Sequence, residues 1–153
     1  MIRLPISTCI ILVIILIGCS NNSSSEDIVA KADLHYNDGN YVTALELYNE
    51  AIQLHPDSES AYNARGYYYL QAGSYDLALK DFEKAIELDP RNSKTYYNQG
   101  TAYLNMGQYD LALTNYTLSI SLNPTTNNYN GQGLALCLLE QCGPAINAFD
   151  DAI

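Results

Sequence analysis

From residue 25 onward, apolar positions recur with the spacing of amphipathic helices. Within Tyr41–Leu54 they stand at i, i+1, i+4, i+7 and i+8, which places them on one face of an α-helix. The next helical pattern has a small residue, Gly66, where two backbones must approach. Between these patterns Pro56 closes one helix and Ser58 can cap the next, while Gly39 ends the preceding helix. The pattern predicts pairs of helices joined by short turns.

This pattern repeats along the chain with a period of 34 residues. Seven positions within a window of eighteen residues are identical in three successive copies. They are Gly39, Gly73 and Gly107; Tyr41, Tyr75 and Tyr109; Ala44, Ala78 and Ala112; Leu45, Leu79 and Leu113; Ile52, Ile86 and Ile120; Leu54, Leu88 and Leu122; Pro56, Pro90 and Pro124. Self-similarity at this density indicates a repeat protein, in which each unit buries its apolar face against its neighbours.

A fourth copy lies one residue out of step with the others. Gly133 follows Gly100 by 33 residues, and the missing residue falls in the loop 125–128, where deletions are well tolerated. In this copy Glu140 stands where the others have a turn glycine, and Pro144 can restart the second helix from its first turn.

The sequence stops inside the second helix of this fourth copy. No polar capping helix follows, so we expect the apolar side chains of Phe149 and Ile153 to be poorly covered and available for docking. Either another molecule covers them or the sequence is a truncated gene product, and both interpretations stay open.

On these positions the chain resembles the tetratricopeptide repeat family. The matching columns are the small residues Ala32, Gly66 and Gly100, the tyrosines Tyr69 and Tyr103, the alanines Ala44, Ala78 and Ala112, and the closing prolines. The resemblance covers residues 25–153 and departs from the family pattern at His35, in the tyrosine column. It implies an all-α fold: a right-handed superhelix of helix-turn-helix repeats, three full (25–58, 59–92, 93–125) and one truncated (126–153).

In that family the first helix of each repeat lines a concave, peptide-binding face. The resemblance places this groove on Tyr36, Asn63, Tyr67, Leu70, Gln71, Lys94, Tyr97, Thr101, Leu104 and Asn105, with Val29, Asp33, Asn130, Leu134, Cys137 and Leu138 beside them. Tyrosines offer flat aromatic surface, and amides can pair with the backbone of an extended peptide. We expect a neutral, aromatic groove; the alternative is that these are merely tolerated surface residues.

One specificity of the family can be tested directly. Its chaperone-binding members clamp a partner's terminal carboxylate with Lys and Asn residues, at positions that correspond here to Val29, Asp33, Ala64, Lys94 and Asn98. Lys94 fits, but two of the positions are apolar and one is acidic. We therefore do not expect an acidic C-terminal tail to bind.

Residues 1–18 have the shape of a secretory signal, with Arg3 near the start and an apolar stretch over 10–17. Their uncharged part is shorter than the roughly 20 residues that span a bilayer as a helix. The end of the segment, Leu16-Ile17-Gly18-Cys19, resembles the lipobox of bacterial lipoproteins, which implies cleavage before Cys19 and lipidation of its thiol. An ordinary signal with a chance cysteine is the alternative.

The lipobox resemblance implies a location in the cell envelope. Acylated Cys19 would hold the protein on the lipid bilayer, and the Ser/Asn-rich residues 19–25 would form a flexible tether. Ser20, rather than Asp, follows the cysteine, which resembles the pattern sorted to the outer membrane, on its periplasmic side, in bacteria with two membranes.

The charge balance narrows the choice of partners. Lys and Arg number 7 against 17 Asp and Glu, so the formal net charge is −10. A chain this acidic has little with which to neutralise phosphates, so we expect no binding of nucleic acid. The first repeat is the most acidic one; we read it as a solvated helix face, with docking of a basic partner as the alternative.

Candidate chemistry is scarce. Phosphate-binding, nucleophile-elbow and zinc-protease motifs are missing from the sequence, so we expect neither a catalytic residue nor a metal or cofactor. Cys137 and Cys142 are interpreted as two core thiols rather than a disulfide. His35 is expected to pack in the repeat core, and His55 to be solvated.

These observations favour a membrane-anchored lipoprotein that acts as a non-catalytic adaptor for other envelope proteins or their peptide segments. A second hypothesis is a self-assembling structural subunit, a homo-oligomer that docks through Phe149 and Ile153 and leaves the groove unused. Fold alone does not identify the partner.

Overall fold

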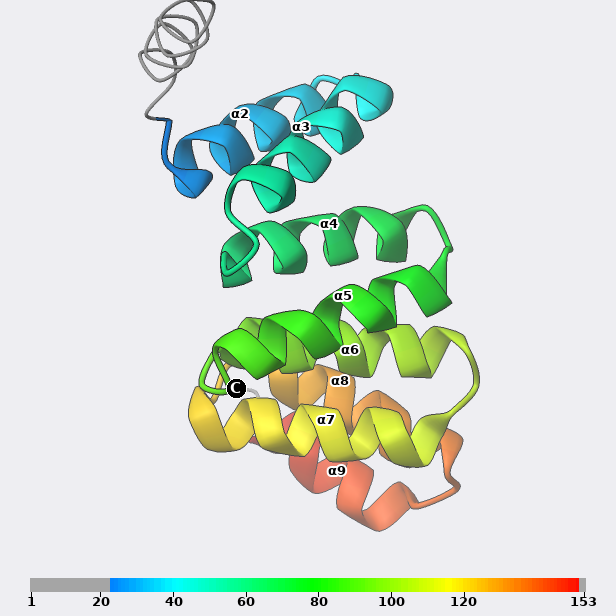
Figure 1. Cartoon of the computed structure of the whole chain (residues 1–153). Coiled ribbons are helices and arrows are strands. Elements are labelled where there is room, and N and C mark those ends of the chain that lie inside the picture. Colours follow the sequence, from blue (N-terminus) through cyan, green and yellow to red (C-terminus); the bar gives the residue numbers. More distant parts are fainter. Residues whose placement is uncertain (1–22, 152–153) are drawn as a thin grey trace, which may run out of the picture.

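The computed structural model describes residues 23–151, which form eight α-helices and no strand (Figure 1). The helices are α2 (Ser25–Asn37), α3 (Tyr41–Leu54), α4 (Glu59–Gln71), α5 (Tyr75–Leu88), α6 (Ser93–Asn105), α7 (Tyr109–Leu122), α8 (Thr126–Leu138) and α9 (Cys142–Asp150). The predicted all-α fold is therefore confirmed. The predicted signal segment, Cys19 and Ile153 lie outside the described residues.

The helices pair into four hairpins that stack one on the next (Figure 1). The first helix of each hairpin contacts the first helix of the following one, from α2 through α4 and α6 to α8. Along the described chain, the second helices α3, α5, α7 and α9 have no Cα atoms within 8 Å of one another. We call α2, α4, α6 and α8 the inner helices and the other four the outer helices.

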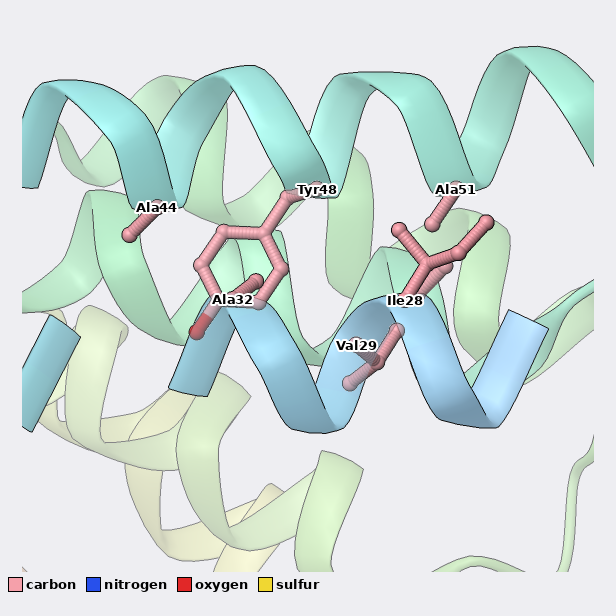
Figure 2. Packing of buried hydrophobic residues seen from close by; sticks show 7 residues of the cluster. Ile28, Val29, Ala32, Ala44, Tyr48 and Ala51 are labelled. Atoms are coloured by element: carbon pink, nitrogen blue, oxygen red, sulfur yellow. The ribbon is translucent and has the colours of Figure 1, made fainter. Parts of the chain in front are cut away.

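Each hairpin closes around alanines and one large ring. In the first hairpin Tyr48 and the alanines Ala44 and Ala51 of α3 pack against Ile28 and Ala32 of α2 (Figure 2). The corresponding rings in the next two hairpins, Phe82 and Tyr116, are also buried. Small side chains on both helices let the backbones approach, so the ring fills the space between them.

Glycine is required where the inner helices α4 and α8 meet these rings. A Cβ atom built on Gly66 would lie 2.6 Å from Cε1 of Phe82, as the predicted close approach demands. α8 has two such glycines, which lie against the rings of two neighbouring hairpins. A Cβ on Gly131 would lie 2.6 Å from Tyr116, and one on Gly133 would lie 2.6 Å from Phe149.

The turns and caps follow the prediction. Gly39, Gly73 and Gly107 end inner helices with φ of 79°, 73° and 75°, which is backbone that favours glycine. Glu140 takes their place before α9 with φ of 61°. The Ser58 hydroxyl accepts from the Ala61 amide at the start of α4, over 3.2 Å.

The N-terminal end of the described chain is more ordered than a tether. Ser24 caps α2 in a capping box with Asp27, and Ser25 begins the helix. His55 was expected to be solvated, but its Nε2 lies 3.1 Å from the carbonyl oxygen of Ser23, to which it can donate a hydrogen bond. The chain is therefore held at the turn before α4.

Cys137 was expected to be a core thiol, and this prediction is wrong. Its thiol is free and its side chain is exposed, so it is not a core residue. Ala135 and Leu136 take the buried positions of α8 instead. Across residues 23–151, no helix combines the length and the apolar content needed to cross a bilayer.

Candidate functional site

The inner helices line a groove that consists of two connected hollows. The first, of about 470 Å³, lies between α2, α4 and α6; the second, of about 500 Å³, reaches from α4 to the start of α8. Both hollows are lined by Tyr67, Lys94 and Asn98, which makes them one continuous surface. An extended segment of another chain would lie across the inner helices here.

Tyrosines form the walls of the groove. The rings of Tyr36 and Tyr67 meet edge to face in the first hollow, with centroids 6.3 Å apart. Tyr97 lines the second hollow and packs against the core ring Tyr116, with centroids 5.6 Å apart. Tyr67 is 41% exposed in the centre of the surface. The groove therefore offers aromatic surface, and Tyr97 is fixed from behind by the core.

A pair of buried amides lies on the floor of the groove. Asn63 is 8% exposed and Asn98 is 3% exposed, and both line the first hollow. The Nδ2 atom of Asn98 donates to Oδ1 of Asn63 over 3.2 Å. Each side chain keeps one further polar group, which suits it to pair with the backbone of an extended peptide.

Acidic groups stand at the α2 end of the groove. Asp33 accepts a hydrogen bond from the Tyr48 hydroxyl over 2.5 Å, and Glu59 accepts from Asn92 and Thr95. Burial raises the pKa of Glu59, and its two hydrogen bonds oppose that shift. Among the described residues, Lys94 is the one cation that lines the first hollow beside these two acids, so this end is acidic rather than neutral as expected from the sequence.

Five of the predicted groove residues do not line the two hollows. Leu70 is 5% exposed and belongs to the core with Phe82, and Leu104 packs against the core of the third hairpin. Thr101 donates to the Tyr97 carbonyl oxygen over 3.0 Å. Gln71 lines a separate hollow beside Tyr36, and exposed Asn105 lines neither part of the groove.

Glu59 is a groove residue that the sequence did not predict. It is the first residue of α4, directly after the Ser58 cap, where an acid ordinarily serves the helix N-terminus. Its bonds to Asn92 and Thr95 cross into the next repeat, 33 and 36 residues away, and turn it toward the first hollow.

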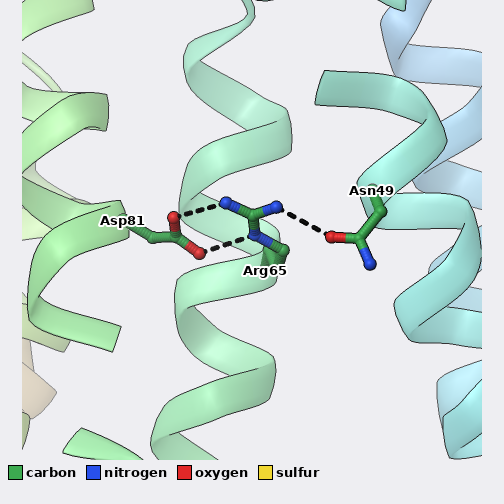
Figure 3. Close-up of polar contacts among 3 residues, drawn as sticks. All are labelled: Asn49, Arg65 and Asp81. Carbon is green, nitrogen blue, oxygen red and sulfur yellow. Dashed lines mark hydrogen bonds and ion pairs between the residues drawn. The ribbon is translucent and has the colours of Figure 1, made fainter. Parts of the chain in front are cut away.

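A second polar cluster lies on another face of α4. Nε and Nη2 of Arg65 donate to the two oxygens of Asp81, over 2.8 and 2.7 Å, and Nη1 donates to Asn49 over 2.7 Å (Figure 3). This arrangement joins α3, α4 and α5 and is structural. Across the described chain, no group of three or more His, Cys, Asp or Glu residues is placed to hold a metal ion.

Comparisons with known proteins agree with the fold. A structure described as "Crystal structure of MamA" superposes with a TM-score of 0.78 at 25% identity, over 90% of this chain and 80% of that one. Another, "Crystal structure of MamA protein", gives 0.76 at 25% identity, over 84% and 70%. These neighbours share the predicted superhelical fold. No curated protein sequence matches the chain.

Models of protein families, compared with the sequence, identify the same type of repeat. Two models, both described as tetratricopeptide repeat, match residues 29–93 and 81–114. The matched ranges include the inner helices α4 and α6, which carry the centre of the groove. The chain therefore contains tetratricopeptide repeats, as its 34-residue period indicated.

Proposed function

We propose that this protein is a non-catalytic scaffold whose groove binds an extended segment of another protein. Tetratricopeptide repeats generally serve as interaction scaffolds, and the observation that carries the proposal here is Tyr67. Its ring stands 41% exposed at the junction of the two hollows, directly beside the buried Asn63–Asn98 pair. An exposed aromatic ring next to unshared amide groups is the arrangement of an interaction hot spot.

The experiment is a pull-down from a detergent extract with tagged full-length protein and its Tyr67→Ala variant. The matched control is Leu111→Ala, which removes an exposed apolar side chain from the outer helix α7. We expect one specific protein, identified by mass spectrometry, to be lost with Tyr67→Ala and retained with Leu111→Ala. A list of bound proteins that Tyr67→Ala leaves unchanged would contradict a partner site in the groove.

The scaffold is further proposed to be a lipoprotein of the bacterial cell envelope. The support is the Leu16-Ile17-Gly18-Cys19 motif after an apolar segment. Two or more acyl chains on Cys19 would give stable attachment, in the outer membrane if the host has two membranes. Mass spectrometry of the mature N-terminus tests this, and Cys19→Ala should release the protein from the membrane fraction. An unmodified Cys19 would contradict the lipid anchor.

Self-association is the second candidate, because the last hairpin leaves apolar side chains uncovered. Ile146 of α9 is 60% exposed and Phe149 is 38% exposed. Ile146→Glu tests the contact without removing the Phe149 ring from its seat against Gly133. Under this hypothesis, sedimentation would show oligomers for the wild type and monomers for Ile146→Glu. A wild type that is monomeric at high concentration would rule the hypothesis out.

A further inference from the structure

We infer that the α2 end of the groove recognises a cationic side chain, lysine or arginine, of the bound segment. The inference rests on the proposed scaffold function and adds the chemistry of the partner. Asp33 from α2 and Glu59 from α4 both line the first hollow, whereas the second hollow has no acidic lining residue within residues 23–151. The groove therefore has an acidic end and an end without acids.

Each carboxylate is held in place through one oxygen. Oδ1 of Asp33 accepts from the Tyr48 hydroxyl, and Oε1 of Glu59 accepts from both Thr95 and Asn92. Across the described residues no further hydrogen bond or ion pair reaches Asp33 or Glu59, so the second oxygen of each stays available. Positioned carboxylates with an open oxygen are suited to charge-assisted hydrogen bonds from a cation.

The aromatic wall favours the same occupant. Tyr36 and Tyr67 line the hollow that holds the two acids, and their rings meet edge to face at 6.3 Å. A ring face attracts an ammonium or guanidinium group, and the ring also covers the apolar stem of such a side chain. Carboxylates and tyrosine rings together match a lysine or arginine better than any neutral side chain.

Lys94 sets the direction of the bound segment. It lines both hollows, so it stands between the acidic end and the second hollow, where it is the one charged lining residue among those described. A cationic residue of the partner is attracted to the α2 end and repelled from the α8 end. The acidic residues of the first repeat were interpreted from the sequence as a solvated helix face. Under this inference one of them, Asp33, contacts the partner instead.

The test is a selection from a displayed library of random dodecapeptides against the full-length protein in detergent. We expect lysine or arginine to be enriched at one fixed position of the selected peptides. The Asp33→Asn/Glu59→Gln variant keeps both accepting oxygens and so keeps the fold. On this variant the enrichment should disappear, and a selected peptide should bind about tenfold more weakly.

Glu46→Gln/Glu50→Gln is the matched control, because it removes the same charge from exposed positions of the outer helix α3. This control should leave peptide binding unchanged. An equal loss of affinity in the control would overturn the inference, because it would show that the net negative charge of the protein attracts the peptide without a specific site. Selected peptides that lose binding to the Tyr67→Ala variant but show no preference for lysine or arginine would overturn this inference and leave the proposed groove intact. If no peptide binds, or binding ignores Tyr67→Ala, the proposed scaffold groove fails as well.

Discussion

At the scale of single residues, stability depends on rings seated against residues that have little or no side chain. The ring column alternates between tyrosine and phenylalanine along the chain, as Tyr48, Phe82, Tyr116 and Phe149. Both tyrosines of the column turn their hydroxyls toward inner-helix residues, Tyr48 to Asp33 and Tyr116 to Thr101. The core of these hairpins is therefore joined directly to side chains near the groove.

Gly66→Ala should destabilise the second hairpin. The new Cβ would lie 2.6 Å from the Phe82 ring and 3.3 Å from the Ala78 carbonyl oxygen, and the buried ring has little space to move. The cost of such overpacking is about 1–3 kcal/mol, which outweighs alanine's better helix propensity. Chemical denaturation measures it. Gly143→Ala, whose Cβ would meet nothing within 4 Å, is the control and should cost nothing.

Buried tyrosines predict a loss of stability at alkaline pH. Burial and the hydrogen bond to Asp33 raise the pKa of Tyr48, and burial raises the pKa of Tyr116. Above the ordinary value of 10.0, tyrosines of the unfolded chain lose their protons while these two keep theirs, so the free energy of unfolding falls as pH rises.

Urea denaturation at about pH 8 and about pH 11 checks this dependence. The Tyr48→Phe variant should show a smaller fall between the two, since phenylalanine does not titrate. Tyr41→Phe, at an exposed position, serves as the control and should behave as the wild type. Equal falls in wild type and Tyr48→Phe would show that Tyr48 is not a source of the alkaline instability.

At the scale of elements, the fourth hairpin differs from the others in its turn. Glu140 has φ of 61°, where the three preceding turns have glycine. Left-handed backbone costs a residue with a side chain roughly 1–2 kcal/mol relative to glycine. The turn between α8 and α9 is therefore strained. Its backbone hydrogen bonds nevertheless match those of the other turns, with the Gln141 amide donating to the Leu136 carbonyl oxygen.

Glu140→Gly should stabilise the fourth hairpin. Release of the strain exceeds the extra flexibility that glycine gives the unfolded chain, so we expect a gain of about 1 kcal/mol. Hydrogen exchange of α8 and α9 amides measures the local effect. The converse change, Gly107→Ala, should weaken the third hairpin by a similar amount; a stabilising effect of Gly107→Ala would contradict the argument.

The sequence predicted helices and turns better than the groove. The limits of Tyr41–Leu54, the Ser58 cap and the glycine turns depend on local patterns, and all were confirmed. Glu59 was missed because its partner Thr95 belongs to the next hairpin. Leu70 was misjudged because its core neighbours Phe82 and Ala102 come from α5 and α6, which the residues beside it in sequence do not reveal. Family position indicated which helix faces the groove, but not which of its side chains the neighbouring repeat covers.

At the scale of the whole molecule, the hairpins are coupled by contacts that cross from one repeat to the next. Arg65 belongs to α4 and binds Asp81 of its own hairpin and Asn49 of the preceding one (Figure 3). Asp81 is nearly fully buried, so its charge depends on this guanidinium. In a linear repeat array, stability is a sum of such units and their interfaces.

Arg65→Met should lower the free energy of unfolding by about 3 kcal/mol, because it leaves the Asp81 carboxylate buried and unpaired. The Arg65→Met/Asp81→Leu double variant should recover much of that loss, since apolar side chains of similar size can replace a buried pair. Both are measured by chemical denaturation. A double variant that is no more stable than Arg65→Met would show that the unpaired charge is not the cause.

The contacts between hairpins also decide how the molecule bends. Cα atoms of successive inner helices lie within 8 Å of one another, while those of successive outer helices across the described chain lie farther apart. When the molecule flexes, the layer of inner helices must then keep a nearly constant length. A change in curvature mainly widens or narrows the spaces between the outer helices. Small rotations at each interface add up along the stack. When the array flexes, the wall of the groove therefore deforms least. A segment bound in the groove meets a surface of nearly constant spacing, while the outer helices take up the deformation.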